Sequence, residues 1–512
     1  MINRILTVGG LTLLSRVTGF LRDIMLAAIL GAGPVADAFF IALRLPNHFR
    51  AIFAEGAFNA AFIPAYARIR GERGGGPARL FADRVFTMLF AAEALLLAVA
   101  LLFTPGVISL LAPGFSADPE RFALAVELTR ITFPYLLLVT LVTLYGGILN
   151  ALQRFATPAA APILLNLSMM ATLALAAFFP TAGHAASWGV FIAGCLEALM
   201  VAADLARDEG LPRFRVLRLD DDVRRFFKAL GPAVLGSAGT QIALFADTII
   251  ASFLAAGAVS ALYYADRINQ LPIGVIGIAV GTVLLPEMAH RIAVGDESGA
   301  RRSQDRAIEF ALLLSIPCVA AFGIVPELIM LALFSRGAFT AADAAAAGAT
   351  LAAYAIGLLT FVLLRAVSAS FLARGDTATP VKALMVSVLV NVGLKILLMD
   401  RYAQVGLAFA TSIGVWVNFI LLVWFAKRRD LIFFDDRLRS SGIKLALSGL
   451  ALAAVLAAAV GPVMRQCESL GALRFVAALG FLGVLSAAVY GAAVAITCGP
   501  GWFREFSRGR SA

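Results

Sequence analysis

Apolar stretches of about 20 residues or more recur along the whole sequence, and they restrict the fold more than any other feature. A helix of that length crosses the ~30 Å hydrocarbon layer of a bilayer. Backbone groups inside that layer must bond within their own segment, and the period-2 alternation of a membrane barrel is missing. The residue content agrees, because 61% of residues are hydrophobic and 14% are charged, against roughly 25% charged in soluble domains. The sequence therefore predicts an all-α polytopic membrane protein.

Glycine, proline and charge clusters divide these stretches into about fourteen predicted membrane helices. The first is expected to be retained rather than cleaved, because Arg16, Arg22 and Asp23 interrupt its apolar run and no small-residue cleavage pattern follows. The predicted spans centre on residues 9–31, 35–66, 80–111, 122–150, 158–180, 185–206, 226–256, 259–290, 307–334, 345–373, 380–399, 403–426, 443–464 and 472–496.

Basic residues are concentrated in alternate loops. One set of loops holds the clusters within residues 68–84, 207–228, 291–306 and 427–444, whereas the opposite loops hold only Arg121, Arg336, Arg401, Arg465 and Arg474. This asymmetry predicts that the first set, and both termini, lie in the cytoplasm. The formal net charge of +10 is then a signal of topology. Nucleic-acid binding is not expected, because no soluble basic domain is present.

Weak internal repetition predicts the domain organisation. Thr157-Pro158 and Thr379-Pro380 each open a span, Gly9 corresponds to Gly231, and the run at Gly33 resembles the run at Gly257, all at offsets of 222 to 224 residues. We therefore expect two parallel six-helix lobes, residues 1–222 and 223–430. Two further spans and a cytoplasmic tail follow in residues 431–512. Parallel repeats of this kind are typical of alternating-access transporters with a substrate cavity between the lobes.

Eight basic residues remain within the predicted spans: Arg16, Arg22, Arg44, Arg50, Arg130, Arg267, Arg365 and Lys395. Each costs roughly 2.5–3.5 kcal/mol at the centre of a membrane helix. They either form internal ion pairs or line a wet cavity. Arg16 lies seven residues before Asp23, and Asp37 lies seven before Arg44, so each couple shares a helix face and can pair. Acids are nevertheless scarce, and we expect Arg16, Arg22 and Arg267 to face water. The guanidinium fork suits a phosphate or pyrophosphate, as in an anionic lipid head group.

A second polar set combines Asp247 with Asn391, Lys395 and Thr411 in predicted spans seven, eleven and twelve. It is either a structural ion pair or a site that couples transport to an ion or proton. Metal binding is not expected, because the three histidines are scattered and the four cysteines, Cys195, Cys318, Cys467 and Cys498, form no ligand pattern.

Several runs carry a family resemblance that covers essentially the whole chain: Ser15-Arg-Val-Thr-Gly-Phe-Leu-Arg-Asp23, Ala36-Asp-Ala-Phe-Phe40, Leu45-Pro-Asn47, Phe53-Ala-Glu-Gly-Ala-Phe58 and Tyr263-Tyr-Ala-Asp-Arg267. The chain resembles the MurJ (MviN) family, the lipid II flippases of the multidrug/oligosaccharidyl-lipid/polysaccharide exporter superfamily. The resemblance implies a V-shaped, two-lobed transporter in the bacterial cytoplasmic membrane, without cofactors, driven by the membrane potential or an ion gradient. Lipid II (the undecaprenyl-pyrophosphate-linked disaccharide pentapeptide) is the implied substrate, with membrane lipids and cell-wall synthesis proteins as further partners.

The resemblance also implies residue roles. Arg16, Arg22, Asp37, Arg50, Ser260 and Arg267 match positions that bind the pyrophosphate and sugar-peptide head, and Asp23 beside Arg22 joins this candidate set. Spans thirteen and fourteen are implied to hold the polyprenyl tail. Some family members are implied to hold sodium in spans seven, eleven and twelve. Here Lys395 stands where an acid is wanted, so its ammonium can replace that ion.

Three other functions compete with the flippase interpretation. A relative in the superfamily can export another polyprenyl-linked glycan or a cationic drug, although a drug exporter would want a net acidic cavity. A membrane glycosyltransferase would need a site in the loops, where the run Asp220-Asp221-Asp222 is the sole candidate. A scaffold without transport is the third, and the basic cluster argues against it.

Overall fold

A computed structural model describes residues 2–53, 57–216, 218–432, 434–499 and 502. The chain folds into two compact units, Met1–Ser260 with Arg336–Phe339, and Ala261–Ser335 with Thr340–Ala512. No strand occurs in the described ranges, and the apolar helices make the chain an all-α polytopic membrane protein, as the sequence predicts. The predicted boundaries at residues 222 and 430 rest on sequence repetition and stay a prediction.

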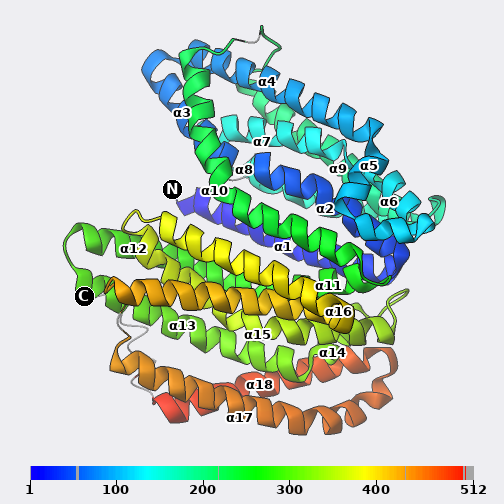
Figure 1. The fold of residues 1–512 in the computed structure, drawn as a ribbon, viewed down its shortest axis with the longest axis vertical. Coiled ribbons are helices and arrows are strands. Elements are labelled where there is room, and N and C mark those ends of the chain that lie inside the picture. The colour runs from blue at the N-terminus through cyan, green and yellow to red at the C-terminus, as the bar shows by residue number, and fades with distance from the viewer. Residues whose placement is uncertain (1, 54–56, 217, 433, 500–501, 503–512) are drawn as a thin grey trace. The chain divides into compact units, whose positions relative to one another are not determined.

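The first unit consists of long helices joined by short turns (Figure 1). Its elements are α1 (Ile2–Leu30), α2 (Pro34–Phe53), α3 (Ala57–Arg73), α4 (Gly75–Leu102), α5 (Thr104–Leu111), η1 (Pro113–Ala117), α6 (Pro119–Thr132), α7 (Tyr135–Ala151), α8 (Ala156–Ala174), η2 (Ala176–Phe178), α9 (Ala182–Asp208), α10 (Asp221–Ser252) and the first turn of α11 (Ala258–Pro272).

The second unit continues from α11. Its elements are η3 (Ile273–Gly277), α12 (Ile278–Ala293), α13 (Glu297–Ile324), α14 (Pro326–Phe334), α15 (Ala341–Leu372), α16 (Ala378–Arg428), α17 (Asp436–Cys467), η4 (Glu468–Leu473) and α18 (Arg474–Cys498). Helices α17 and α18, the predicted spans thirteen and fourteen, pack side by side (Figure 1).

Nine helical stretches in the described part of the chain are long and apolar enough to cross a membrane. One of them, α16, has 51 residues, which is about 77 Å of helix and far more than one crossing needs. The non-helical Ala403 (φ 44°, ψ −131°) divides it where the sequence predicts the turn between two spans. All fourteen predicted segments fall on helices, but their number as membrane crossings stays a prediction.

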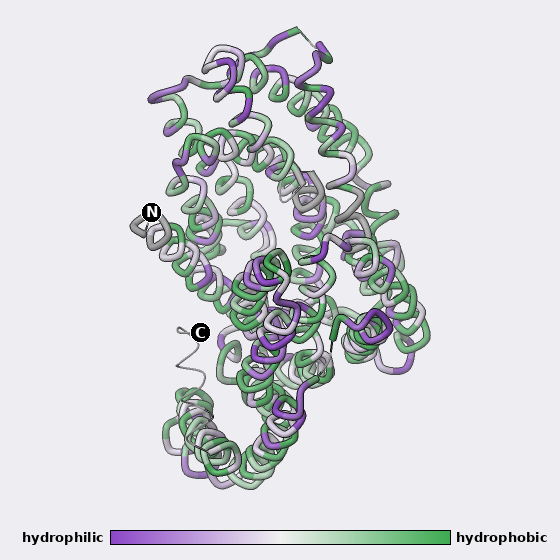
Figure 2. The backbone as a smooth tube through the Cα atoms, turned by 90° about the vertical axis from the view of Figure 1, so that its left-hand side faces the viewer, coloured by the Kyte–Doolittle hydropathy of each residue, from purple (hydrophilic) through white to green (hydrophobic). Residues whose placement is uncertain are grey.

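Hydrophobic residues occupy most of each helix (Figure 2), and many large ones are exposed, such as Leu102 and Leu397, at 75% each. Soluble proteins rarely expose apolar surface on this scale, so these side chains are suited to contact lipid. Predicted span eight is broken as its glycines and prolines indicate, because α11 ends at Pro272 and a π-helical turn, η3, leads into α12. Such turns are frequent at functional sites.

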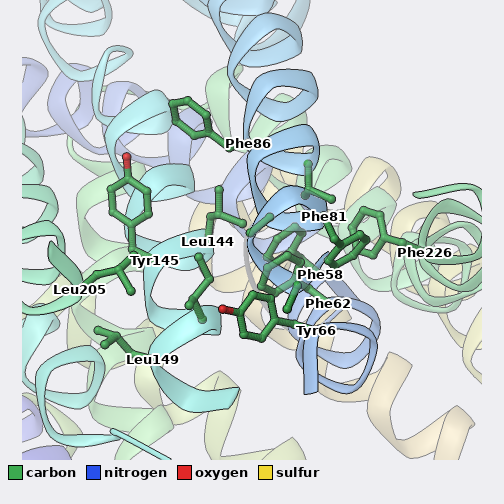
Figure 3. Close-up of a cluster of buried hydrophobic side chains, with 14 of the residues drawn as sticks. Phe58, Phe62, Tyr66, Phe81, Phe86, Leu144, Tyr145, Leu149, Leu205 and Phe226 are labelled. Atoms are coloured by element: carbon green, nitrogen blue, oxygen red, sulfur yellow. The ribbon is translucent and has the colours of Figure 1, made fainter. Parts of the chain in front are cut away.

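An aromatic cluster holds α3, α4, α7 and α10 of the first unit together (Figure 3). The Phe62 ring stacks on Phe58 and Phe81, with centroids 5.0 and 5.6 Å apart, and meets Phe226 edge-on at 6.2 Å. Because Phe62 is fully buried, its ring joins elements that are more than 160 residues apart in sequence, from α3 to α10.

We expect Phe62→Ala to destabilise the first unit by about 3–5 kcal/mol, because the substitution leaves a cavity among three aromatic rings. Thermal unfolding of the purified protein, followed by fluorescence-detected size exclusion, measures the effect. Phe103→Ala removes an exposed ring and serves as the matched control. Equal unfolding midpoints for the two variants would contradict the packing described here.

Candidate functional site

The most complete polar site in the first unit surrounds Asp37, in the first turn of α2. The side chain of Asp37 is 0% exposed. Its Oδ2 accepts hydrogen bonds from Arg121 Nη2 at 2.6 Å and from the Gly257 amide at 2.8 Å. Its Oδ1 accepts from the Ser260 amide at 2.8 Å and from the Ser260 hydroxyl. Each carboxylate oxygen therefore receives two donors, which compensates for the loss of water around a buried charge.

The position of this carboxylate follows from helix chemistry. Gly257 and Ser260 flank the start of α11, where backbone amides have no partner within the helix. A carboxylate there satisfies these amides and interacts favourably with the positive end of the helix dipole. Asp37 thus caps α11 from another helix, 220 residues earlier in the chain.

Glycine permits the backbone to close around this junction. Ala338, in the short segment assigned to the first unit, donates its amide to the Ala28 carbonyl at the end of α1, at 2.8 Å. Gly337 has φ 60°, and a Cβ there would lie 2.2 Å from the Ala28 oxygen. Any side chain at Gly337 would therefore separate the two segments.

Arg121 is the cationic partner at the start of α6. Its guanidinium donates to Asp37 and, through Nη1, to the Leu254 carbonyl at 3.2 Å, and it stacks on the Phe115 ring at 3.8 Å. The sequence places Arg121 in a loop, and the structure shows it buried and ion-paired. The partners are 84 residues apart, and no local pattern in the sequence signals this pair.

Arg22 forms a second buried polar group, between α1 and α8. It donates to Asp23 Oδ1 through Nη2 at 2.7 Å and to Asn166 Oδ1 through Nη1 at 3.0 Å. Asn166 in turn donates to the Ser15 carbonyl and to the Thr18 hydroxyl of α1. The candidate residues Arg22 and Asp23 therefore face each other and α8, and exposure of Arg22 to an aqueous cavity stays a prediction for another state of the protein.

The two pairs that the seven-residue spacing permits do not form in the structure. Asp23 bonds to Arg22 rather than Arg16, and Asp37 bonds to Arg121 rather than Arg44. The seven-residue spacing was a sound basis for a shared face. Instead, Asn166 binds the Arg22 guanidinium beside Asp23, and the amides at the start of α11, with Arg121, bind the Asp37 carboxylate.

Arg16 and Arg44 are the cations left over. Arg16 is exposed and Arg44 half-buried, and neither has a hydrogen-bond or ion-pair partner within the described residues. Their charges therefore remain available for an anion or for water. The side chain of Arg50, and the run between Phe53 and Ala57, lie outside the described part of the structure.

In the second unit, the guanidinium of Arg267 lies 4.6 Å from the Tyr263 ring centroid, one helical turn earlier in α11. Arg365 on α15 packs against Gly277, at the π-helical turn. A Cβ added at Gly277 would lie 3.1 Å from the Cδ of Arg365. Arg365 thus borders the irregular turn. Ser260, at the start of the same helix as Arg267, bonds to Asp37 within the first unit.

The second polar set is divided between the units. Asp247 belongs to the first, whereas Asn391, Lys395 and Thr411 lie on α16 in the second. Lys395 is buried, at 2% exposure, one turn after Asn391. Asn391 packs closely against Gly414 in the second half of α16. A Cβ added at Gly414 would lie 2.9 Å from the Cβ of Asn391. The Thr411 hydroxyl donates to the Leu407 carbonyl within its own helix. The predicted four-residue site stays a prediction.

The described residues contain no group of three or more His, Cys, Asp or Glu side chains that could hold a metal ion. The four cysteines are free thiols. The arrangement instead provides buried, satisfied ion pairs beside unpaired guanidinium groups, which can bind and release an anionic group but offer no nucleophile–base pair.

Comparison with known proteins gives a consistent result. The sequence family described as "Lipid II flippase MurJ" matches residues 26–478. "Probable lipid II flippase MurJ" of Rhizobium meliloti (strain 1021) is 43% identical over 428 residues, 82% of this chain and 80% of the relative. The Rhizobium tropici protein of that name is 38% identical over 499 residues, 96% and 93% of the two chains. "Lipid II flippase MurJ" of Burkholderia cenocepacia is 33% identical over 83% and 84%.

Solved structures agree on the fold. A lipid II flippase MurJ in an inward closed conformation has a TM-score of 0.81 at 24% identity, covering 98% of this chain and 99% of that one. An inward-facing multidrug resistance MATE family transporter of the MOP superfamily has a TM-score of 0.66 at 16% identity, covering 81% and 94%.

We expect Asp37→Ala to destabilise the protein by about 3–5 kcal/mol, because it leaves Arg121 buried without its counter-charge and the first amides of α11 without an acceptor. The unfolding midpoint and the folded yield measure this. Asp436→Ala is the control, since Asp436 is fully exposed and 3.8 Å from Arg439, and it should change stability by less than about 1 kcal/mol. A stable Asp37→Ala protein would show that the junction does not hold the unit together.

Proposed function

The chain belongs to the lipid II flippase MurJ family, a family of transporters rather than enzymes, and we propose that it moves lipid II from the cytoplasmic to the periplasmic leaflet of the bacterial inner membrane. The observation that carries this proposal is the pair of guanidinium groups, Arg16 and Arg44, that have no partner among the described side chains although the helices around them are apolar. An isolated cation is costly in such surroundings, and a pyrophosphate would compensate for that cost.

The head group is held in a central cationic cavity. Arg16, Arg22, Arg50 and Arg267 bind its pyrophosphate, and neighbouring polar groups bind the sugar-peptide part. The polyprenyl tail stays in lipid beside α17 and α18, whose exposed faces are apolar, as at Ile443 and Val484. The head thus crosses without leaving its tail, which explains why a flippase needs a polar path and no catalytic centre.

Transport proceeds by alternating access, with both termini in the cytoplasm. The Asp37 junction acts as a releasable contact in this cycle, because its bonds join the start of α2 to the starts of α6 and α11 through one carboxylate. Breaking it exposes a carboxylate and the Ser260 hydroxyl together, and both then become available to the substrate. Asp37 and Ser260 therefore bond to each other in the closed state, and both bond to the head group of the substrate in the open state.

No cofactor takes part, and the membrane potential or an ion gradient supplies the energy. The buried ammonium of Lys395, one turn from Asn391, stands in for a coupling cation. A fixed positive charge there removes the need for a bound sodium ion.

Arg16→Ala should lower transport by roughly 10- to 100-fold while the protein reaches normal levels in the membrane, because a charge-assisted bond to the substrate is lost and no buried partner is abandoned. Movement of fluorescent lipid II in reconstituted vesicles, with immunoblots of membrane fractions, tests this. Arg22→Ala should also abolish transport while the protein stays in the membrane at a near-normal level, whereas a loss of folded protein would show that Arg22 serves the packing of α1 instead. Full transport by Arg16→Ala would refute the role of Arg16.

Flipping should continue when sodium is exchanged for potassium or choline at fixed membrane potential, because Lys395 supplies the positive charge. Lys395→Gln should lower the rate, whereas Lys382→Gln, at an exposed position of the same helix, should not. The same vesicle assay measures both. A strong, saturable dependence on sodium in the unmodified protein would contradict this interpretation of Lys395.

A further inference from the structure

Residues 211–216, 218 and 219, between α9 and α10, are called the basic strap below, and residues 213–215 lie along α4. The Arg213 amide donates to Asp83 Oδ1 at 2.9 Å, and the Arg215 amide donates to the Thr87 hydroxyl at 3.0 Å. The Phe214 ring packs on Phe86 and Phe90, with centroids 4.9 and 5.2 Å apart. The strap is therefore held to one membrane helix by alternating backbone bonds and a ring contact.

The depth of the strap follows from the sequence of α4. Asp83 and Arg84 are the last charged residues before an apolar run from Val85 to Leu102, which Glu93 alone interrupts. The polar contacts of the strap therefore lie at the end of the apolar run. Phe214 lies beside the first two turns of that run. This is the boundary between head groups and hydrocarbon, where apolar and basic side chains are both stable.

The strap and the first two turns of α10 carry basic side chains without acidic partners. Within the described residues no ion pair involves Arg213, Arg218, Arg224, Arg225 or Lys228, and all five are exposed. Other basic residues of the same unit are neutralised: Arg70 pairs with Glu209, Arg84 with Asp220, and Arg154 with Asp204 and Asp208. Arg215 of the strap pairs with Asp83 at 3.3 Å, so the five exposed cations are those that remain available there for an outside anion.

The corresponding segment of the second unit is different. There Arg429 pairs with Asp376, Arg306 with Asp435, and Arg437 with Glu309. The pKa of Asp376, outside the membrane helices, is lowered to about 2 by hydrogen bonds from the Thr379 amide and hydroxyl and by Arg429, so this acid is ionised at neutral pH. Three basic residues of this region are thus matched by acids, although Lys427 and Arg428 beside them are exposed and have no ion pair among the described residues.

Apolar side chains emerge between these charges. Val216 is 78% exposed and Leu219 is 64% exposed, and Phe227 follows on α10. A surface for nucleic acid or an acidic protein would gain little from exposed aliphatic groups at this depth. Lipid head groups combine a phosphate with an apolar region directly beneath, which matches this alternation of charge and apolar side chain.

We propose that the basic strap and the start of α10 form a binding site for anionic phospholipids of the cytoplasmic leaflet, separate from any site for the transported lipid. Arg213, Arg218, Arg224, Arg225 and Lys228 contact the phosphates. Val216 and Leu219 insert between the upper acyl chains. The site anchors the connection between α9 and α10 to the membrane surface.

A fluorophore at position 216 tests this locally in the full-length chain. The four native cysteines are replaced, Val216→Cys is labelled with an environment-sensitive dye, and the protein is reconstituted in phosphatidylcholine vesicles with or without phosphatidylglycerol. Doxyl-labelled lipid of either type then quenches the dye according to its occupancy beside the strap. We expect doxyl-labelled phosphatidylglycerol to quench the dye more strongly than doxyl-labelled phosphatidylcholine. In R213Q/R218Q this preference should fall by roughly fivefold for each Arg that is removed.

The matched control is R302Q/K382Q, which removes two exposed basic residues of the second unit that have no ion pair in the described structure. This control should leave the preference for phosphatidylglycerol unchanged. The folded yield should be normal for both double variants. Equal quenching by the two lipids in the unmodified sequence, or an equal loss in the control, would overturn the proposal. Because the readout is lipid contact, its failure is distinguishable from a failure of lipid II transport.

Discussion

The first unit depends on the hydrogen bonds and the ion pair that the Asp37 carboxylate forms. A fully buried charge is tolerated only when each of its oxygens is satisfied, and here the donors come from the starts of α6 and α11. One side chain thus joins the starts of three helices. Since all four donors converge on one group, the junction breaks as a unit, which is a property that a transporter with two states needs.

The other intramembrane charges fall into two classes with different consequences. Arg22 is matched by Asp23 and Asn166 and therefore stabilises the packing of α1 on α8. The exposed Arg16 and the half-buried Arg44 have no such match within the described residues, so their charges are available to an anion or to water. A membrane protein with both classes combines a rigid scaffold with charges available for binding, as expected for the lipid II flippase MurJ family.

The sequence predicted the all-helical membrane fold, the turn near Ala403 and the family, all of which are confirmed. These features depend on local patterns of hydropathy, glycine and proline, or on runs that are characteristic of one family. Ion-pair partners were not predictable in the same way. Arg121 meets Asp37 and Asn166 meets Arg22 only through tertiary packing, and spacing along one helix favoured Arg16 and Arg44 instead. The roles of the candidate residues stay predictions.

Depletion of the protein, followed by measurement of how much lipid II a membrane-impermeant periplasmic enzyme can reach, tests the central claim most directly. If the chain flips lipid II, the fraction of lipid II that the enzyme can reach falls as the protein is depleted. Lipid II then accumulates in the cytoplasmic leaflet. Re-expression of the unmodified sequence should restore accessibility. An unchanged accessible fraction, with growth arrested and the protein gone, would contradict the account.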